Sequence, residues 1–462
     1  MGNMQVGATA YYLFIAAVFF LYWTASGYRL ARLAVVLLAN YFFCAHFGLF
    51  YIFLLPVCSA IDYLVGLGLM RVEGQRMRRC LLGISLTVNL GLLVGSRHMP
   101  LFLNHGSSMP GWNWVFPLGL SFYVFQALTY TIDLYRRDGD GTRSLLAHLS
   151  AVSFFPTLQA GPITRVSELV KQLEAPPNLA RTVGGQAFFL IGLGLLKKFL
   201  LADYLANNFV NRVFDTPKLY SGTEALLAVY AYSVQLYYDF SGYTDLARGT
   251  ALLLGIRLPI NFDRPYLAGN PQEFWRRWHI TFSNWLRDYL YFSLPGKRGK
   301  VMPYLNLVIT MVIGGLWHGL AWTFAIWGLL HGVGLAVSRR WQALRRGHPA
   351  VSWTRPLRIV LTYQFVCLTW VFFRASSLTN AWELLGRIGS ASFAVTNVTI
   401  PIAAVLLLAV AAHFVPKEHY ARVMNAFAGS PSWVHAAALI LVAVAIQLLA
   451  GHGSAPFVYS RF

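Results

Sequence analysis

Charged side chains are scarce in this chain of 462 residues, of which Asp, Glu, Lys and Arg make up 12%. An ordinary soluble domain carries about 25%. Because 57% of the residues are hydrophobic, too little polar surface remains to cover a large soluble fold. The composition therefore excludes an ordinary globular protein, and the apolar runs that recur along the whole chain predict an all-α polytopic membrane protein.

Acidic residues are rarer still, with 17 against 37 basic residues and a formal net charge of +20. Such an excess can indicate nucleic-acid binding, but no nucleic-acid motif accompanies it here. The basic residues instead cluster between apolar runs, at 71–79, 136–143, 297–300 and 339–346. Cytoplasmic loops of membrane proteins show this bias. We therefore expect a multi-pass membrane protein, in contact with lipid and without a nucleic-acid partner.

Cysteine is also rare, and no CxxC spacing occurs among Cys44, Cys58, Cys80 and Cys367. A redox pair and a zinc site are therefore not indicated, and we expect four small buried hydrophobes. The sequence also has no P-loop and no GxSxG elbow. We expect no bound metal and no permanently bound cofactor.

Apolar stretches that approach the length of a membrane-spanning helix recur about 10 to 12 times. They lie near 9–26, 30–46, 48–70, 80–96, 114–135, 183–205, 222–240, 301–317, 319–338, 357–374, 398–415 and 433–450. Some are broken by glycine, which membrane depth tolerates only where the backbone is buried in protein or lines a cavity. No repeat or soluble domain is visible, so we expect residues 1–462 to form a single membrane domain.

The segment 259–300 is too polar to span the membrane and too aromatic for a solvated loop. Asn270 can cap a helix that opens with Pro271, and Glu273 completes a capping-box arrangement. Aromatic and polar residues then recur at steps of three and four, as on two adjacent helix faces. The aromatic residues are Trp275, Trp278, Phe282, Trp285, Tyr289 and Phe292, and the polar ones are Arg276, His279, Ser283 and Arg287. The pattern predicts one amphipathic helix over about 271–294, interfacial or re-entrant, beside a wet cavity.

Two histidines stand out in this apolar sequence. His318 follows an apolar run and is flanked by Trp317 and Gly319, and His279 lies in the polar stripe. Because lipid penalises polar groups and a neutral histidine can accept a proton from a hydroxyl, both are candidate catalytic residues. The alternatives are a packing histidine at 318 and an interfacial, water-exposed histidine at 279. His331 would lie roughly 20 Å from His318 along a continuous helix, so we expect it to be structural.

Basic residues near His279 are candidate ligands for an anionic acyl donor. Arg276, Arg277 and Arg287, with Lys297 and Arg298 nearby, could bind a pyrophosphate. The alternative is that they anchor the segment at lipid head groups. Four aspartates in the region could pair with these arginines; they are Asp239, Asp245, Asp263 and Asp288.

Several runs between about 115 and 338 together resemble the membrane-bound O-acyltransferase family. They are Phe155–Ile163, Tyr237–Asp245, Leu258–Phe262, Asn270–Pro295, Gly314–Gly319 and Trp327–Gly332. The branch that they resemble most is the bacterial one that O-acetylates alginate and related exopolysaccharides. The D-alanylation protein for teichoic acid belongs to a neighbouring branch.

The resemblance implies a ring of helices around a central tunnel that admits donor and acceptor from opposite faces. It assigns the catalytic histidine to His318 and the second family histidine to His279. It further implies acetyl-CoA as the cytoplasmic donor, an exported polysaccharide such as alginate or cellulose as the acceptor, and periplasmic acetyltransferase proteins as partners. No residue is an obvious covalent nucleophile, so direct transfer is favoured. D-alanyl transfer from a carrier-protein thioester and a proton-coupled transporter remain as alternatives, although a transporter would usually show inverted repeats.

Overall fold

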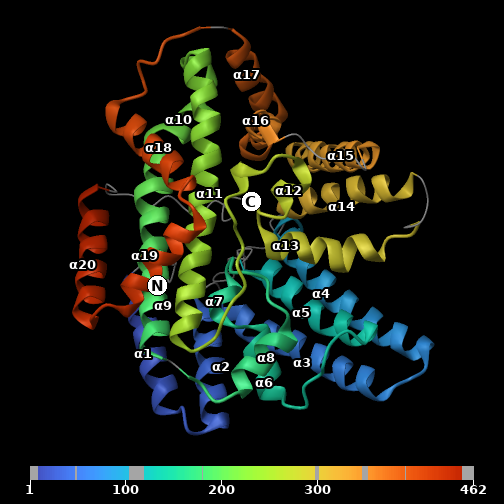
Figure 1. Cartoon of the computed structure of the whole chain (residues 1–462). Helices are drawn as coiled ribbons and strands as arrows, with labels where there is room; N and C mark the ends of the chain where they lie inside the picture. Colours follow the sequence, from blue (N-terminus) through green and yellow to red (C-terminus); the bar gives the residue numbers. More distant parts are fainter. Residues whose placement is uncertain are drawn as a thin grey trace. The chain divides into compact units, whose positions relative to one another are not determined.

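The computed structural model describes residues 9–46, 49–103, 119–178, 180–296, 301–345, 352–390 and 392–449. Over these ranges the chain is built from helices joined by short connections and contains no β-strand (Figure 1). The predicted all-α fold is confirmed.

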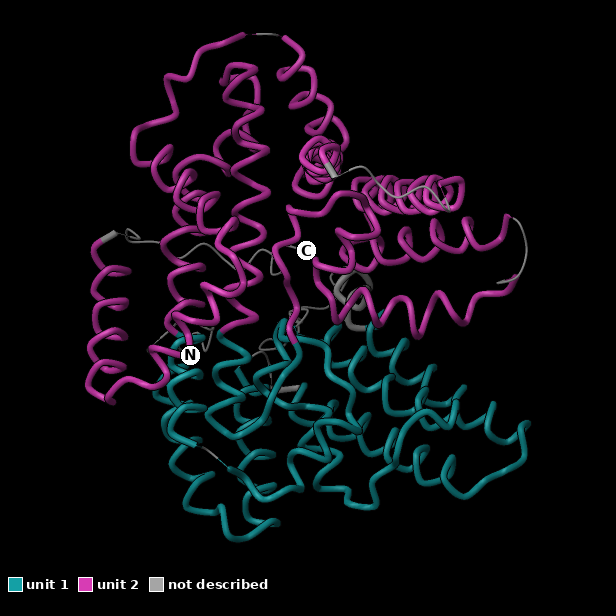
Figure 2. The backbone as a smooth tube through the Cα atoms, in the orientation of Figure 1, with its two compact units in different colours: residues 1–191, 246–259 teal, residues 192–245, 260–462 magenta. Residues whose placement is uncertain are grey.

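The chain divides into two compact units, shown in different colours in Figure 2. Unit 1 comprises residues 1–191 and 246–259, and unit 2 comprises residues 192–245 and 260–462. Helices α9 (Arg181–Leu195) and α11 (Gly222–Leu253) contribute residues to both units. The expectation of a single membrane domain stays a prediction.

Unit 1 begins with long helices and continues with short ones. They are α1 (Thr9–Thr24), α2 (Arg29–Ala45), α3 (Leu49–Arg71), α4 (Gln75–Leu103), α5 (Leu120–Arg136), α6 (Leu145–Val152), α7 (Phe155–Leu158) and α8 (Val166–Glu174). Arg78 donates from one nitrogen to Leu69 O at 2.6 Å and from the other to Leu134 O at 2.8 Å. Since the last carbonyls of a helix lack intrahelical partners, this buried guanidinium satisfies the ends of α3 and α5 together.

Unit 2 holds the remaining elements. After α9 come the π-helical segments η1 (Leu196–Asp203) and η2 (Ala206–Val210), then α10 (Asn211–Asp215), η3 (Pro217–Leu219), α11 and η4 (Pro265–Leu267). Next are α12 (Pro271–Trp275), α13 (Ile280–Trp285), η5 (Leu286–Leu290), η6 (Tyr291–Ser293), α14 (Met302–His318) and α15 (Trp322–Leu344). The last are η7 (Ser352–Thr354), α16 (Arg355–Arg374), α17 (Leu378–Gly389), α18 (Ile400–His413), α19 (Lys417–Gly429) and α20 (Ser432–Leu449).

Helices α14 and α15 form a tightly packed hairpin (Figure 1). A Cβ atom at Gly315 would lie 2.3 Å from the carbonyl oxygen of Phe324, and one at Gly328 would lie 2.4 Å from that of Met311. Only glycine permits backbones to approach this closely. The glycines around Trp317-His318 therefore admit α15, which places His318 beside it.

Three described helical stretches are long and apolar enough to cross a membrane, at Tyr51–Arg71, Gln75–Gly95 and Arg355–Arg374. Helices α18 and α19, bent by 96° at their junction, would count as a fourth if they form one broken span. Shorter apolar helices occur at Ala10–Thr24, Leu145–Leu158, Met302–His318 and Ser432–Leu448. The count of about 10 to 12 spans and the central tunnel stay predictions.

The cysteines follow the expectation in three of four cases. Cys44, Cys58 and Cys367 are buried, whereas Cys80 is exposed, and all four are free thiols. The expectation of four buried hydrophobes is wrong for Cys80, which lies in the first turns of α4 after an exposed connection.

Candidate functional site

The segment that was predicted to form one helix over 271–294 is broken. Its start is as expected, because the Asn270 side chain accepts from the backbone N–H of Glu273 at 2.9 Å and Pro271 opens the helix. The Glu273 carboxylate reaches back to the N–H of Gly269 at 2.8 Å. Helix α12 nevertheless ends at Trp275, and His279 adopts a left-handed conformation with φ +42° before α13 begins at Ile280. The prediction of a continuous helix is wrong.

A neighbouring loop causes the break. The backbone oxygen of Asn261 accepts from the N–H of Ile280 at 2.9 Å. The side-chain oxygen of Asn261 accepts from Thr281 N at 3.1 Å and Thr281 Oγ1 at 2.9 Å. In the other direction, the N–H of Asp263 donates to Arg277 O at 2.9 Å. These bonds replace the hydrogen bonds that a continuous helix would supply, and they offset the cost of a left-handed histidine.

His279 is enclosed and held by this loop. Its side chain is 1% exposed, and Nδ1 lies 3.2 Å from Asn261 Oδ1. The ring packs edge-on against Phe240 at 4.6 Å between centroids and stacks on Phe282 at 4.9 Å. Burial lowers the pKa of the His279 imidazole well below its ordinary value, and neighbouring His318 lowers it further. His279 is thus a neutral, buried imidazole, which contradicts the alternative of a water-exposed interfacial residue.

His318 is the last residue of α14 and lies in an aromatic enclosure. The ring is edge-on to Phe373 at 4.9 Å and to Trp327 at 5.4 Å, and Phe324 lies 6.0 Å away. The side chain is buried. A Cβ atom at Gly319 would lie 2.5 Å from the Phe324 ring, so glycine at this position lets the enclosure close around the histidine.

The structure brings the two candidate histidines into one region of unit 2. Phe282 stacks on His279, and its centroid lies 6.4 Å from that of His318. Phe282 also packs on Trp317 at 4.6 Å. Two buried imidazoles therefore share one aromatic wall, in surroundings where water is scarce and electrostatic interactions are strong.

His331 differs because both of its ring nitrogens have assigned hydrogen bonds. Trp275 Nε1, which can only donate, lies 3.2 Å from His331 Nδ1. Nε2 lies 2.9 Å from Thr369 Oγ1, whose hydroxyl donates to Val366 O at 2.7 Å. His331 is therefore neutral, with its proton on Nε2, and it ties α12 to α15 and α16. This network agrees with the structural role expected for it.

The three candidate donor-binding arginines are in different situations. Arg277 forms an ion pair with Glu273 at 2.7 Å, and Arg287 pairs with the adjacent Asp288 at 2.8 Å. Arg276 is exposed. Lys297 and Arg298 lie outside the described residues. Two of the three arginines thus already have carboxylate partners, and their role toward a donor stays a prediction.

Three of the four nearby aspartates pair with lysines, not with these arginines. Asp239 bonds to Lys198 at 2.6 Å, Asp245 to Lys197 at 2.6 Å, and Asp263 to Lys417 at 2.5 Å. Sequence reasoning missed these pairs because the partners lie far apart in the chain. It also assigned no role to Asn261, whose contacts with the site are 18 and 20 residues away.

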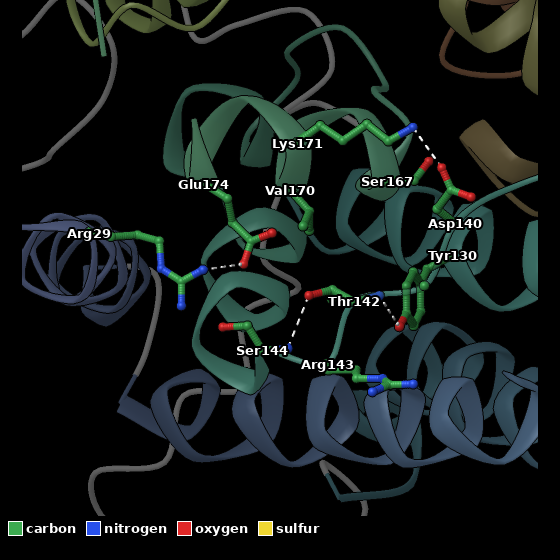
Figure 3. A pocket seen from close by; sticks show the side chains of 11 residues that line it. Arg29, Tyr130, Asp140, Thr142, Arg143, Ser144, Ser167, Val170, Lys171 and Glu174 are labelled. Atoms are coloured by element: carbon green, nitrogen blue, oxygen red, sulfur yellow. Dashed lines mark hydrogen bonds and ion pairs between the residues drawn. The ribbon is translucent and has the colours of Figure 1, made fainter. Parts of the chain in front are cut away.

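The described residues also line a separate, charged cavity in unit 1 that is open to solvent. It has a volume of about 590 Å³. Figure 3 shows Arg29 directed at Glu174 and Lys171 directed at Asp140, with distances of 3.5 and 2.8 Å. The hydrogen bond from Lys171 lowers the pKa of the Asp140 carboxyl. None of the predicted site residues lines this cavity.

Across the described residues, no group of three or more His, Cys, Asp or Glu side chains is placed to hold a metal ion. A neutral imidazole can accept a proton or position a hydroxyl. The expectation that the protein binds no metal stays a prediction.

The sequence model of the membrane-bound O-acyltransferase family matches residues 139–379, which include both histidines. The chain belongs to this family. It is also 38% identical over 373 residues to a probable alginate O-acetylase AlgI of Azotobacter vinelandii, covering 76% of this chain and 72% of that one. Together these findings confirm an O-acyltransferase of the membrane-bound family.

Other similar proteins act on different polymers, as their names state. A peptidoglycan O-acetyltransferase of Helicobacter pylori is 36% identical over 77% of this chain and 73% of its own length. A teichoic acid D-alanyltransferase of Streptococcus thermophilus is 30% identical over 57% of this chain and 69% of its own length. The family is thus established as a membrane acyltransferase family, while these relatives differ in both acyl group and acceptor.

Proposed function

We propose that this multi-pass acyltransferase of the bacterial inner membrane takes an acetyl group from cytoplasmic acetyl-CoA toward a hydroxyl of an exported polysaccharide, such as alginate or cellulose. The observation that carries the proposal is the pair of buried histidines, His279 and His318, on the shared wall of Phe282. The similarity to alginate O-acetylases over three quarters of the chain supports an acetyl group and a polysaccharide. Periplasmic acetyltransferase proteins are proposed as partners in the final transfer.

His318 is proposed as the general base. It takes the proton of the acceptor hydroxyl, whose oxygen forms a bond to the acyl carbon of the thioester. The carbon–sulfur bond then breaks, and the leaving thiolate takes the proton to give the free thiol. The aromatic enclosure excludes water, which would otherwise compete with the acceptor for the acyl group. His279 holds the acceptor or the donor in place.

The three candidate arginines differ in whether a carboxylate already occupies them. Arg276 is exposed and is the member of the predicted set best able to meet a pyrophosphate. Arg277 and Arg287 would have to exchange Glu273 and Asp288 for the donor. We therefore propose Arg276 as the principal donor-binding residue of the three.

The test uses purified full-length protein in lipid nanodiscs with labelled acetyl-CoA and alginate oligosaccharides. We expect thiol release coupled to acetylation of the oligosaccharide. His318→Ala should lower the rate by about 10²- to 10⁴-fold, the usual contribution of a general base. His419→Ala, which removes an exposed histidine, is the control and should leave the rate unchanged.

D-alanyl transfer is the second candidate, because the chain is 30% identical to a teichoic acid D-alanyltransferase. A parallel reaction with a D-alanyl-charged carrier protein separates the two. If thiol is released from the charged carrier protein and not from acetyl-CoA, the carrier thioester is the donor and the proposal of acetyl-CoA is wrong. Full acetylation by the His318→Ala variant would contradict the catalytic assignment.

A further inference from the structure

Asn261 and His279 form a buried contact whose hydrogen-bond direction can be worked out. Asn261 is 1% exposed. One atom of its amide faces three groups, namely Thr281 N at 3.1 Å, Thr281 Oγ1 at 2.9 Å and His279 Nδ1 at 3.2 Å. Oxygen and nitrogen of an amide have the same shape, so the partners decide which atom this is.

The backbone of Thr281 settles the orientation. A backbone N–H can only donate, so the amide atom that faces it is the oxygen. The opposite orientation would set the Asn261 NH₂ group against the Thr281 N–H. The orientation with the NH₂ group toward Thr281 is therefore excluded. The orientation with the oxygen toward Thr281 leaves Asn261 Nδ2 buried without a hydrogen-bond partner among the described residues. Asn261 therefore presents an acceptor to His279.

The acceptor in turn determines the proton position on His279. Facing an oxygen at 3.2 Å, Nδ1 must carry the hydrogen and donate it. A neutral imidazole has only one N–H, so Nε2 carries a lone pair. The ring packs against Phe240 at 4.6 Å and Phe282 at 4.9 Å between centroids, and these contacts restrict its rotation away from Asn261.

We propose that Asn261 is a positioning residue that holds His279 with its proton on Nδ1, so that Nε2 accepts a hydrogen bond from a second hydroxyl of the acceptor sugar, distinct from the hydroxyl that His318 deprotonates. The identity of that hydroxyl rests on the proposed function. The proposal assigns His279 to the acceptor and not to the donor, because polarising the acyl carbonyl of the donor would require an N–H on Nε2.

His331 supplies an internal contrast, because its neighbours set the opposite arrangement. Trp275 donates to its Nδ1, and its Nε2 faces the Thr369 hydroxyl. Two buried histidines of one unit are thus held with their protons on different nitrogens. The difference follows from the partner of Nδ1, which is an acceptor for His279 and a donor for His331.

The first test measures kcat and KM of Asn261 variants in the acetyl-transfer assay. Asn261→Leu removes the acceptor, and we expect kcat to fall about 10- to 100-fold, as it does when a group that orients a metal-ligating histidine is lost. Asn261→Asp keeps an acceptor and should recover most of this loss. The added carboxylate favours the imidazolium, so the acid limb of its pH–rate profile should move to higher pH. Equal kcat values for wild type and Asn261→Leu would overturn the proposal.

The second test observes the tautomer directly and needs no activity. The chain has 12 histidines, and ¹⁵N-histidine spectra of wild type and a His279→Gln variant identify the His279 signals by difference. We expect a protonated Nδ1 and an unprotonated Nε2 in wild type and in Asn261→Asp, and a mixture or the opposite tautomer in Asn261→Leu. A protonated Nε2 in wild type would overturn the proposal even if acetyl transfer is found, whereas a failure of acetyl transfer alone would leave this result intact.

A matched variant separates positioning from stability. Asn40, in unit 1, is also fully buried and also bonds to backbone groups, donating to Ser150 O at 2.9 Å and accepting from Phe155 N at 2.9 Å. Asn40→Leu should destabilise the protein without altering the His279 signals or the shape of the pH–rate profile. The same spectral change in both variants would indicate a general loss of structure and would overturn the specific role of Asn261.

Discussion

Lys198 in unit 2 and Lys171 in unit 1 make the same contact in opposite surroundings. Lys198 Nζ lies 2.6 Å from Asp239 and 2.8 Å from Asp203, and these side chains are only 10%, 2% and 3% exposed. Lys171 Nζ lies 2.8 Å from Asp140, with side chains 66% and 80% exposed. The distances are nearly equal, so the contacts differ in burial and in the second carboxylate that Lys198 also meets. Removing one partner of a buried pair leaves an uncompensated charge, whereas water replaces a lost partner at the surface.

The cavity of unit 1 and the histidine site of unit 2 also differ in their exposure to solvent. The cavity of unit 1 offers space and charge, but its ion pairs are open to solvent. The histidine site of unit 2 is enclosed by aromatic rings, and the buried imidazole of His279 is neutral. An enclosed site makes each hydrogen bond worth more and leaves proton positions determined by few neighbours. This is the environment in which an imidazole can act on a hydroxyl.

The largest effect is expected from Lys198→Met. The substitution leaves Asp203 and Asp239 buried without their cation, so the free energy of unfolding should fall by about 3–5 kcal/mol. Denaturant or thermal unfolding in detergent measures it. The double variant Lys198→Met/Asp239→Leu should recover part of the loss. A fall in the free energy of unfolding of less than about 1 kcal/mol would contradict the difference between Lys198 and Lys171, since Lys198 would then behave like a surface residue.

An intermediate effect is expected from Thr369→Val, which leaves the Nε2–H of His331 buried without an acceptor. Such a loss costs about 1–3 kcal/mol. Thr362→Val is the matched control on the same helix, because among the described residues the Thr362 hydroxyl bonds to Arg358 O one turn earlier and to no other side chain. Equal unfolding free energies for the two variants would show that the His331 network contributes nothing to stability.

The smallest effect is expected from Lys171→Met. Its partner Asp140 remains hydrated when the ion pair is lost, so the unfolding midpoint should match that of wild type, at low and at high salt. A clear fall of the midpoint, as expected for Lys198→Met, would contradict the view that burial, not distance, decides how much these ion pairs contribute to stability.

The start of α12 could be predicted from the sequence, whereas its end could not. The cap by Asn270 involves residues three positions apart, so the local pattern Asn-Pro-x-Glu is sufficient. The break at His279 depends on Asn261, which is 18 residues away in the chain. The aromatic and polar stripes over 271–294 follow helical spacing, but hydrogen bonds from the loop at 261–263 override that preference.

The candidate site shows the same division. The composition predicted a membrane protein, the settings of His318 and His279 made them candidate residues, and the resemblance of several runs to a known family implied acyl transfer. The arginine set was chosen from proximity in sequence, which does not reveal that Glu273 and Asp288 already engage two of its members. Lys198 was not among the candidate residues, because its partner Asp239 lies 41 residues later in the chain.

The sequence by itself determined the all-α class, the membrane setting, the helix cap at Asn270 and the two histidines. These follow from composition and from interactions between residues three or four positions apart, which every chain with this pattern shares. Only the tertiary structure decided where the helix breaks, which charges pair and which nitrogen of His279 carries the proton. Those outcomes depend on single hydrogen bonds between segments distant in the chain, and a pattern of residue types contains no information about which distant donor will meet which acceptor.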